Sequence, residues 1–151
     1  MGDVYLIIRQ IIPNDLEAME DLDKKCFTNE VRYNRYTLDY YLSLPESIGL
    51  VQTMEDKLLG FIITTMAAEQ IANIVTIDVH PLFRRHSIGS NLINAAKVIL
   101  NERRVSKISL QVADNNQAAI KFYIKHGFKV MKKLPKYYPN TDGYQMEYIT
   151  R

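Results

Sequence analysis

The sequence is poor in cysteine and has no long apolar run. Its one cysteine, Cys26, cannot form a disulfide within the chain, which suits a reducing compartment. No stretch reaches the roughly 18–20 consecutive apolar residues that a membrane span needs, and the N-terminus lacks the basic, apolar and small-residue pattern of a signal peptide. These absences favour a cytoplasmic protein that has no membrane partner.

Charge and ligand-binding motifs are also sparse. The formal net charge of +2 is too near neutrality to argue for nucleic acid as a partner. The lysines at 129, 132, 133 and 136 could contact nucleic acid, but such a run is more often a solvated edge strand, so this partner is not expected. The three histidines have no metal-ligand spacing with acidic residues or with Cys26, so no metal site is expected. The chain has no G-x-x-x-x-G-K-[S/T] loop and no G-x-G-x-x-G turn, which argues against the common nucleoside triphosphate and dinucleotide folds.

The hydrophobic pattern changes between strand and helix spacing along the chain, and 151 residues fit one domain, 1–151. Helices are expected at Leu16–Phe27, Thr37–Leu44, Ser87–Arg103 and Asn116–His126. Strands are expected at Val4–Ile12, Ile48–Met54, Leu58–Met66, Ile71–Val79, Lys107–Val112, Phe128–Lys133 and Tyr144–Ile149, with a tyrosine-rich loop before the last. This order predicts an α/β domain with a mixed, mostly antiparallel sheet of about seven strands and about four helices.

The segment Val79–Ser90 joins a predicted strand to a predicted helix. Such a junction presents unpaired backbone N–H groups at the positive end of the helix dipole, which suits a phosphate. Glycine, serine and arginine side chains in the segment would allow close approach and add donors. An alternative is a plain connection in which Ser87 caps the helix. The candidate anion-binding residues are Val79, Arg84, Arg85, His86, Ser87, Ile88, Gly89 and Ser90.

Two segments carry a family resemblance. Arg84-Arg-His-Ser-Ile-Gly89 resembles the Q/R-x-x-G-x-G/A acyl-CoA motif of GNAT acetyltransferases, except that Ser87 replaces the first glycine. Asn116-Gln-Ala-Ala-Ile-Lys-Phe-Tyr-Ile-Lys-His-Gly-Phe128 resembles the N-x-x-A-x-x-x-Y-x-x-x-G-F signature of the same family. The motifs occur in the family's order and separation, so the resemblance extends over nearly the whole chain. It implies the GNAT fold and acetyl-CoA as cosubstrate.

The resemblance also implies roles for individual residues. Asn116 would bind the pantetheine arm, and Tyr123 would protonate the departing thiolate, since a phenol of pKa about 10 keeps its proton at neutral pH. From spacing alone, Tyr123 could instead be a core residue. The strands Ile71–Val79 and Lys107–Val112 would splay to admit the pantetheine, and backbone N–H groups near Val79 would form an oxyanion hole.

Two further segments resemble the N-terminal acetyltransferases within this family. Phe27-Thr-Asn-Glu-Val-Arg-Tyr33 resembles their peptide-binding loop, and Lys136-Tyr-Tyr138 with Asp142-Gly-Tyr-Gln-Met146 resembles their closing hairpin. Ordinary loop and hairpin packing is the alternative for both. The resemblance makes Phe27, Glu30, Val31, Tyr33, Tyr137 and Tyr138 the candidate substrate-binding residues.

The positions where these enzymes commonly carry a general base hold amides, Asn73 and Gln111, which can orient a water but cannot accept the proton. An α-amine is roughly 10% neutral at pH 7, whereas a lysine amine is neutral only about four times in ten thousand. The missing bases therefore disfavour lysine as the acceptor. Glu30 is a candidate water-mediated base, with His80 and His86 as alternatives.

Acetyl transfer to protein or peptide N-termini is the leading hypothesis, with the ribosome or an auxiliary subunit as a further partner. Ribosomal-protein acetylation like that of the RimI branch is one form of it. Acetylation of lysine or small amines, and non-catalytic acyl-CoA sensing, stay open.

Overall fold

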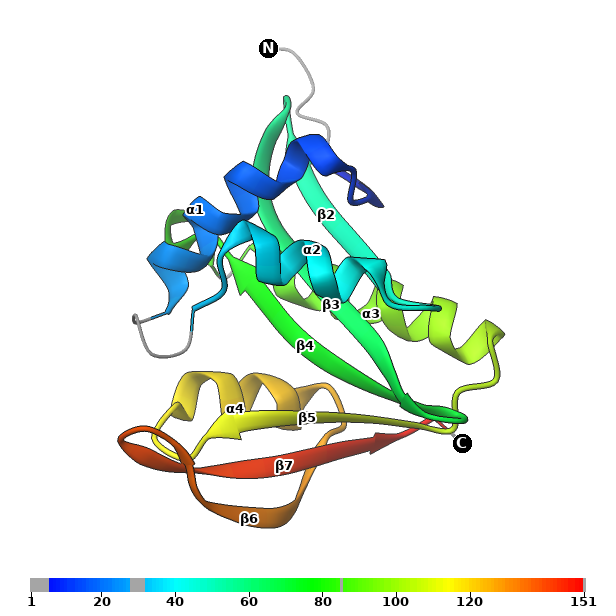
Figure 1. The fold of residues 1–151 in the computed structure, drawn as a ribbon, viewed down its shortest axis with the longest axis vertical. Coiled ribbons are helices and arrows are strands. Elements are labelled where there is room, and N and C mark those ends of the chain that lie inside the picture. The colour runs from blue at the N-terminus through cyan, green and yellow to red at the C-terminus, as the bar shows by residue number, and fades with distance from the viewer. Residues whose placement is uncertain (1–5, 28–31, 85, 151) are drawn as a thin grey trace.

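The computed structural model describes residues 6–27, 32–84 and 86–150 (Figure 1). Within them, four helices and seven strands follow the predicted order. The helices are α1 (Leu16–Cys26), α2 (Arg35–Ser43), α3 (Ile88–Glu102) and α4 (Gln117–Lys125). The strands are β1 (Leu6–Gln10), β2 (Ile48–Met54), β3 (Lys57–Ala68), β4 (Ile71–Val79), β5 (Lys107–Ala113), β6 (Lys129–Tyr138) and β7 (Thr141–Ile149). The 3-10 turns at Pro13–Asp15 and Pro81–Phe83 were not expected.

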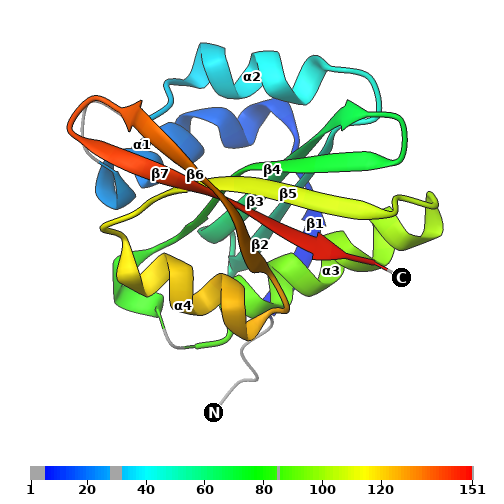
Figure 2. The same ribbon diagram turned by 90° about the horizontal axis from the view of Figure 1, so that it is seen from below.

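The strands form one sheet in the order β1-β2-β3-β4-β5-β7-β6. All neighbours are antiparallel except β4 and β5, which are parallel because the α3 crossover connects them. Helices α1 and α2 cover one face of the sheet, and α3 and α4 cover the other (Figure 2). The predicted mixed, mostly antiparallel α/β architecture is confirmed. In the described part of the chain, no helix combines the length and apolar character needed to cross a membrane.

The central strands β4 and β5 diverge along their length, as predicted. They pair only from Ile71 with Lys107 to Asn73 with Ser109, whereas β4 continues to Val79 and β5 to Ala113 (Figure 1). Beyond Asn73, the edge of β4 that faces β5 has no strand partner among the described residues. Backbone N–H groups along this edge are therefore open to a ligand.

A bulge in β4 decides which side chains face α1. Ile63 of β3 pairs with Thr76, but the next residue along β3, Thr64, pairs with Ile74. One residue of β4, between Ile74 and Thr76, is therefore unpaired. Paired residues share a face of the sheet, and Phe61, the partner of Asp78, packs in the apolar cluster under α1. Thr76 and Asp78 are consequently turned toward α1 rather than α3.

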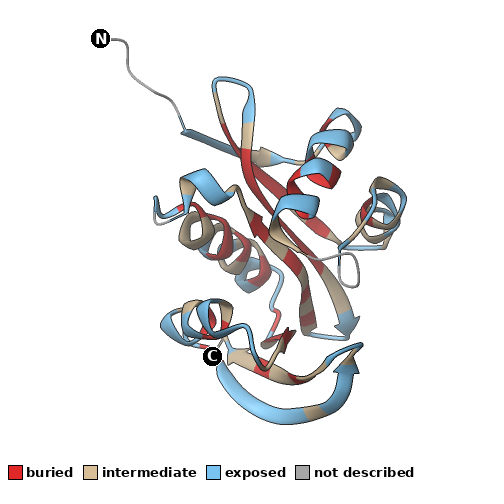
Figure 3. Cartoon of the chain, turned by 90° about the vertical axis from the view of Figure 1, so that its left-hand side faces the viewer, coloured by how far each residue is buried: buried red, intermediate tan, exposed pale blue. Residues whose placement is uncertain are grey.

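Apolar packing is concentrated in the central strands and the helices that cover them, whereas β6 is exposed along most of its length (Figure 3). The larger cluster joins α3 and α4 to the sheet, and a smaller one joins α1 and α2 to β2 and β3. The α1 cluster consists of Met19, Leu22, Leu38, Val51, Phe61 and Ile63.

The last hairpin differs from the prediction. The tyrosine pair was expected in a loop, but β6 extends to Tyr138, and a turn of two residues leads directly into β7. Asp142 explains the extension, because its Oδ1 accepts a 2.7 Å hydrogen bond from the backbone N–H of Lys136, and its Oδ2 lies 3.4 Å from Nζ of Lys133. These contacts hold an irregular stretch of β6 against β7, so the tyrosine pair stands on a strand.

Candidate active site

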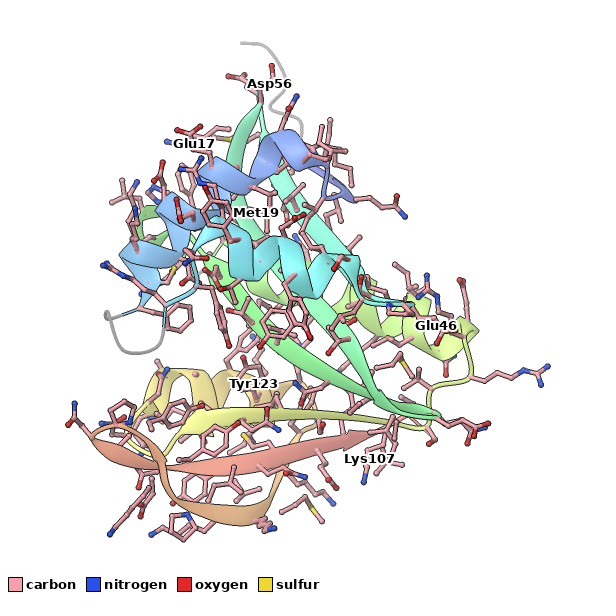
Figure 4. All side chains as sticks on the ribbon, viewed as in Figure 1. Glu17, Met19, Glu46, Asp56, Lys107 and Tyr123 are labelled. Atoms are coloured by element: carbon pink, nitrogen blue, oxygen red, sulfur yellow. The ribbon has the colours of Figure 1, made fainter. Side chains whose placement is uncertain are left out.

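A cavity of about 760 Å3 lies where β4 and β5 have diverged. Its walls come from the second half of β4, the end of β5, the start of α3 and one face of α4. Tyr123 projects from α4 into the space between that helix and β4 (Figure 4). Of the predicted site residues, the cavity is lined by Phe27, Tyr33, Val79, Arg84, Ser87, Ile88, Gly89, Ser90, Gln111, Asn116, Tyr123 and Tyr138.

The start of α3 has an unusual backbone. Ser87 is the N-cap residue, as the alternative reading expected, but its φ is +64°, in the left-handed region. Its carbonyl accepts from the N–H of Asn91 at 2.8 Å, while its hydroxyl makes no capping hydrogen bond within the described structure. Only glycine adopts this conformation without steric cost, which gives a physical reason for the glycine in the family motif.

Replacing Ser87 with glycine should stabilise the protein. The substitution relieves the left-handed strain and loses no capping bond, so we expect a gain of about 0.5–1 kcal/mol in the free energy of unfolding, measured by urea denaturation. Ser87→Ala is the matched control, because alanine keeps the Cβ and therefore the strain. A Ser87→Gly protein no more stable than Ser87→Ala would contradict this account.

Gly89 allows two helices to approach closely. A Cβ at this position would lie 3.1 Å from the Phe122 ring of α4 and 3.6 Å from Cγ2 of Val79. The sequence suggested that this glycine makes room for a ligand, but the crowding found here comes from the neighbouring helix. Gly89 therefore brings the N–H groups of α3 beside the wall formed by α4.

Some of the remaining residues of the segment Val79–Ser90 line the cavity, and others do not. Nε of Arg84 lies 3.4 Å from the carbonyl oxygen of Val79, and the hydroxyl of Ser90 lies 2.9 Å from Nε2 of His126. His86 is exposed near the Phe83 ring and is not one of the described residues that line the cavity. Arg85 lies outside the described residues.

Helix α4 brings the second motif to the same cavity. Oδ1 of Asn116 accepts a 3.2 Å bond from the backbone N–H of Ala119 and so caps the helix, which leaves Nδ2 to serve a ligand. Tyr123 is only 9% exposed and packs edge-on against Phe122 and Phe128. Burial, with the nearby Asp78 carboxyl, raises the pKa of Tyr123 well above the ordinary phenol value. Its hydroxyl therefore keeps its proton at neutral pH.

Each of the two segments proposed to bind the acceptor contributes a tyrosine to the larger cavity. Tyr33 and Tyr138 line it, and burial raises the pKa of each phenol to about 12. Tyr137 is 52% exposed, and its ring lies 5.0 Å from that of Tyr138. Phe27, just after α1, lines the same cavity. Glu30 and Val31 lie outside the described residues.

A second cavity, of about 480 Å3, adjoins the first on the side of Tyr137. Asn73 and Gln111 line it, and Gln111 also lines the larger cavity, so the two meet where the strands part. Oδ1 of Asn73 accepts a 3.0 Å bond from Ser109, and its Nδ2 donates to the carbonyl of Ile74. These contacts engage the Asn73 amide on both sides.

The structure adds cavity residues that sequence reasoning missed. Lys125, in the last turn of α4, lines the cavity and brings a cation toward the start of α3. It lies on one helical face with Ala118 and Phe122, so the helical spacing could have revealed it. Thr76 of β4 also lines the cavity, although its burial hid it among the apolar residues of a predicted strand.

Two other reactive side chains considered from the sequence, Cys26 and His80, make structural contacts, although Cys26 also lines the larger cavity. Burial raises the pKa of the Cys26 thiol to about 11, and its Sγ contacts the Val79 carbonyl at 3.4 Å. Nδ1 of His80 accepts from the N–H of Leu82 at 3.2 Å and so caps a 3-10 turn. Among the described residues, no three His, Cys, Asp or Glu side chains gather as a metal site would require.

Comparison with known proteins places these features in a family. The acetyltransferase (GNAT) family model matches residues 16–128. The crystal structure of Ard1 from Thermoplasma volcanium superposes with a TM-score of 0.88 at 31% identity, covering 95% of this chain and 97% of that one.

Two curated relatives match over shorter stretches. The [ribosomal protein bS18]-alanine N-acetyltransferase of Escherichia coli is 33% identical over 91 residues, which are 60% of this chain and 61% of that enzyme. The catalytic subunit of the N-terminal acetyltransferase B complex of Saccharomyces cerevisiae is 39% identical over 75 residues, which are 48% of this chain and 38% of that subunit.

Proposed function

Because the chain belongs to the acetyltransferase (GNAT) family, we propose that it transfers the acetyl group of acetyl-CoA directly to the α-amino group of a protein or peptide. The observation that carries this proposal is the pair of cavities that meet at Gln111, where β4 and β5 part. The larger cavity begins at a helix N-terminus, and the smaller one is lined in part by Tyr137. A donor and an acceptor could therefore approach the same point from opposite sides.

The larger cavity suits the chemistry of coenzyme A. The N–H groups in the first turn of α3 would receive the pyrophosphate, with Arg84 and Lys125 supplying positive charge. The free edge of β4 after Asn73 offers backbone groups to the two amides of a pantetheine arm. Nδ2 of Asn116 would donate to the same arm, since its Oδ1 is already engaged.

The proposed transfer assigns Tyr123 the proton of the departing thiolate. Its raised pKa keeps the hydroxyl protonated, and Tyr123 lines the larger cavity, which supports this role. Backbone N–H groups near Val79 would stabilise negative charge on the thioester oxygen, because they lie along the free edge of β4.

The acceptor is proposed to be an α-amine because neither Asn73 nor Gln111 can remove a proton from a lysine. The names of the two curated relatives, one acting on ribosomal bS18 and one belonging to an N-terminal acetyltransferase complex, favour the same acceptor class. A ribosomal protein or a partner subunit in the cytoplasm fits this proposal.

A peptide panel tests the acceptor class. With acetyl-CoA, peptides that carry a free N-terminus should gain one acetyl group on the first residue, located by fragment mass spectrometry. The control peptides have the same sequences with a blocked N-terminus and one internal lysine, and should stay unmodified. Modification of the lysines would indicate a lysine acetyltransferase, whereas bound CoA with no product on any amine would indicate a sensor.

A further inference from the structure

Two aspartates are buried together at the interface between α1 and the sheet. Asp78 of β4 is 1% exposed, and Asp23 of α1 is fully buried. The β4 bulge turns Asp78 toward α1, where Asp23 lies on the same helical face as Met19. Burying two carboxyl groups side by side is costly unless they share a proton, so this pair needs a physical explanation.

One oxygen of each carboxyl group accepts a hydrogen bond from a neighbouring residue. The hydroxyl of Thr76 donates to Oδ1 of Asp78 at 2.6 Å, and the backbone N–H of Tyr33 donates to Oδ2 of Asp23 at 2.5 Å. Oδ2 of Asp78 and Oδ1 of Asp23 are buried and have no hydrogen-bond partner within the described structure. The two carboxyl groups are close enough to shift each other's pKa, so a proton on one of them can bond the other. One proton between these two oxygens satisfies both, with the negative charge stabilised on Asp23 by the Tyr33 N–H.

The surrounding groups favour one shared proton over two ionised carboxylates. Burial and the neighbouring Asp23 raise the pKa of Asp78 well above the ordinary carboxyl value, and burial raises the pKa of Asp23 as well. Arg84 and Arg32 oppose these shifts without reversing them. Among the described residues, Cys26 and Tyr123 also lie near Asp78, and Tyr33 lies near Asp23.

We propose that the chain Thr76–Asp78–Asp23 takes up the proton that the acceptor amine loses during acetyl transfer. This inference rests on the proposed acetyltransferase function and supplies the base that Asn73 and Gln111 cannot provide. Thr76 is the link to the reaction, because it lines the larger cavity while its hydroxyl bonds Asp78. In this relay Thr76 is the residue that contacts the acceptor, and Asp78 and Asp23 act through it.

The proton movement balances atom by atom. As the bond from the acceptor nitrogen to the acetyl carbon forms and the bond from that carbon to sulfur breaks, the nitrogen gives its proton to Oγ1 of Thr76. The hydroxyl proton of Thr76 passes to Oδ1 of Asp78, and the proton on Oδ2 of Asp78 passes to Oδ1 of Asp23. The thiolate takes its proton from Tyr123. Exchange with solvent after product release restores Tyr123 and the pair, so one proton has moved from nitrogen to sulfur.

Conservative variants test the relay. In Asp78→Asn, the amide N–H can donate to Asp23 as the shared proton does, but the residue can accept no proton. Turnover should fall roughly tenfold to hundredfold, with the KM for acetyl-CoA and acceptor changed less than about twofold. Turnover should fall by a similar factor in Thr76→Val and by much less in Thr76→Ser. The variant that combines Thr76→Val with Asp78→Asn should lose no more turnover than the worse of the two single variants. Asp56→Asn, the same change in the exposed β2–β3 turn, is the matched control (Figure 4).

Two readouts separate a relay from a structural role. The acid limb of the turnover–pH profile, where the pair would hold two protons, should change in Asp78→Asn to the limb set by protonation of the acceptor amine alone. The infrared carbonyl band of a protonated carboxyl group should be present at neutral pH in the unmodified protein and missing in this variant. An unchanged acid limb, additive losses in the double variant, or no protonated-carboxyl band would each overturn the relay.

The experiment can separate a failure of the relay from a failure of the proposed N-terminal function, because it does not depend on which amine is the acceptor. The variants are compared on whichever amine the unmodified protein acetylates in a panel of N-terminal peptides, lysine peptides and polyamines. Activity on lysine alone would overturn the N-terminal proposal and still test the relay. If no amine is acetylated, both the N-terminal proposal and the relay are wrong.

Discussion

Replacing Tyr123 with phenylalanine should lower turnover about 100-fold or more and change the dissociation constant of acetyl-CoA by less than about threefold. The phenylalanine ring keeps the packing against Phe122 and Phe128, so the fold and the cavity wall should persist. Only the hydroxyl is lost, and with it the proposed proton donor for the thiolate. Steady-state kinetics with CoA release as the signal, together with calorimetric titration of acetyl-CoA, measure the two quantities separately.

The matched control is Tyr40→Phe, which removes a phenol that is 59% exposed on α2 and should leave turnover unchanged. Because an unprotonated thiolate leaves less readily than a thiol, a substrate whose leaving group has a lower pKa should recover part of the lost rate in Tyr123→Phe. Full turnover in Tyr123→Phe would remove this residue from the acid role and return it to its alternative as a core residue.

Replacing Gly60 with alanine should destabilise the protein by about 2–3 kcal/mol and also weaken acetyl-CoA binding. Gly60 pairs with Val79, and a Cβ there would lie only 2.7 Å from the backbone carbonyl oxygen of Asp78. A backbone atom cannot turn aside as a side chain can, so β4 itself would have to move. That movement would shift the free edge of β4 and the wall of the cavity together.

Gly49→Ala is the comparison for this substitution. The close contacts of a Cβ at Gly49 are with the side-chain ends of Leu42 and Ile11, which can change rotamer, and Cβ of Ile11 lies at an ordinary contact distance of 3.4 Å. Its cost should therefore be smaller, and acetyl-CoA binding should be unaffected. Thermal unfolding with and without acetyl-CoA measures both effects, and equal losses in the two variants would contradict the assignment of Gly60 to the support of β4.

The sequence was sufficient to predict the elements that build the cavity. The strand Ile71–Val79 was predicted with its observed bounds, because an apolar, β-branched run ends shortly before Pro81. The helices on either side of β5 were also predicted to within a few residues, since Gly127 marks the end of one and the strand-to-helix turn begins the other. The resemblance to the family then indicated which of their residues would line a common cavity.

Features that depend on tertiary contact could not be predicted in this way. The extent of β6 depends on how Asp142 bonds the backbone of Lys136, which is a contact across a hairpin. The left-handed conformation of Ser87 is not visible in a serine that also reads as an ordinary helix cap. Asp23 carried a usable clue, since a carboxylate on the apolar face of α1 is unusual, but its partner Asp78 is distant in the sequence.

The parting of β4 from β5 has a consequence for the cohesion of the molecule. Three residue pairs join the half of the sheet made by β1 to β4 to the half made by β5, β7 and β6. A cosubstrate lying along the free edge of β4 would act as a missing strand between these halves. The contacts that bind the cosubstrate would therefore also stabilise the fold. Each release of CoA would then loosen the sheet itself, and the protein would be most rigid while it holds the group it transfers.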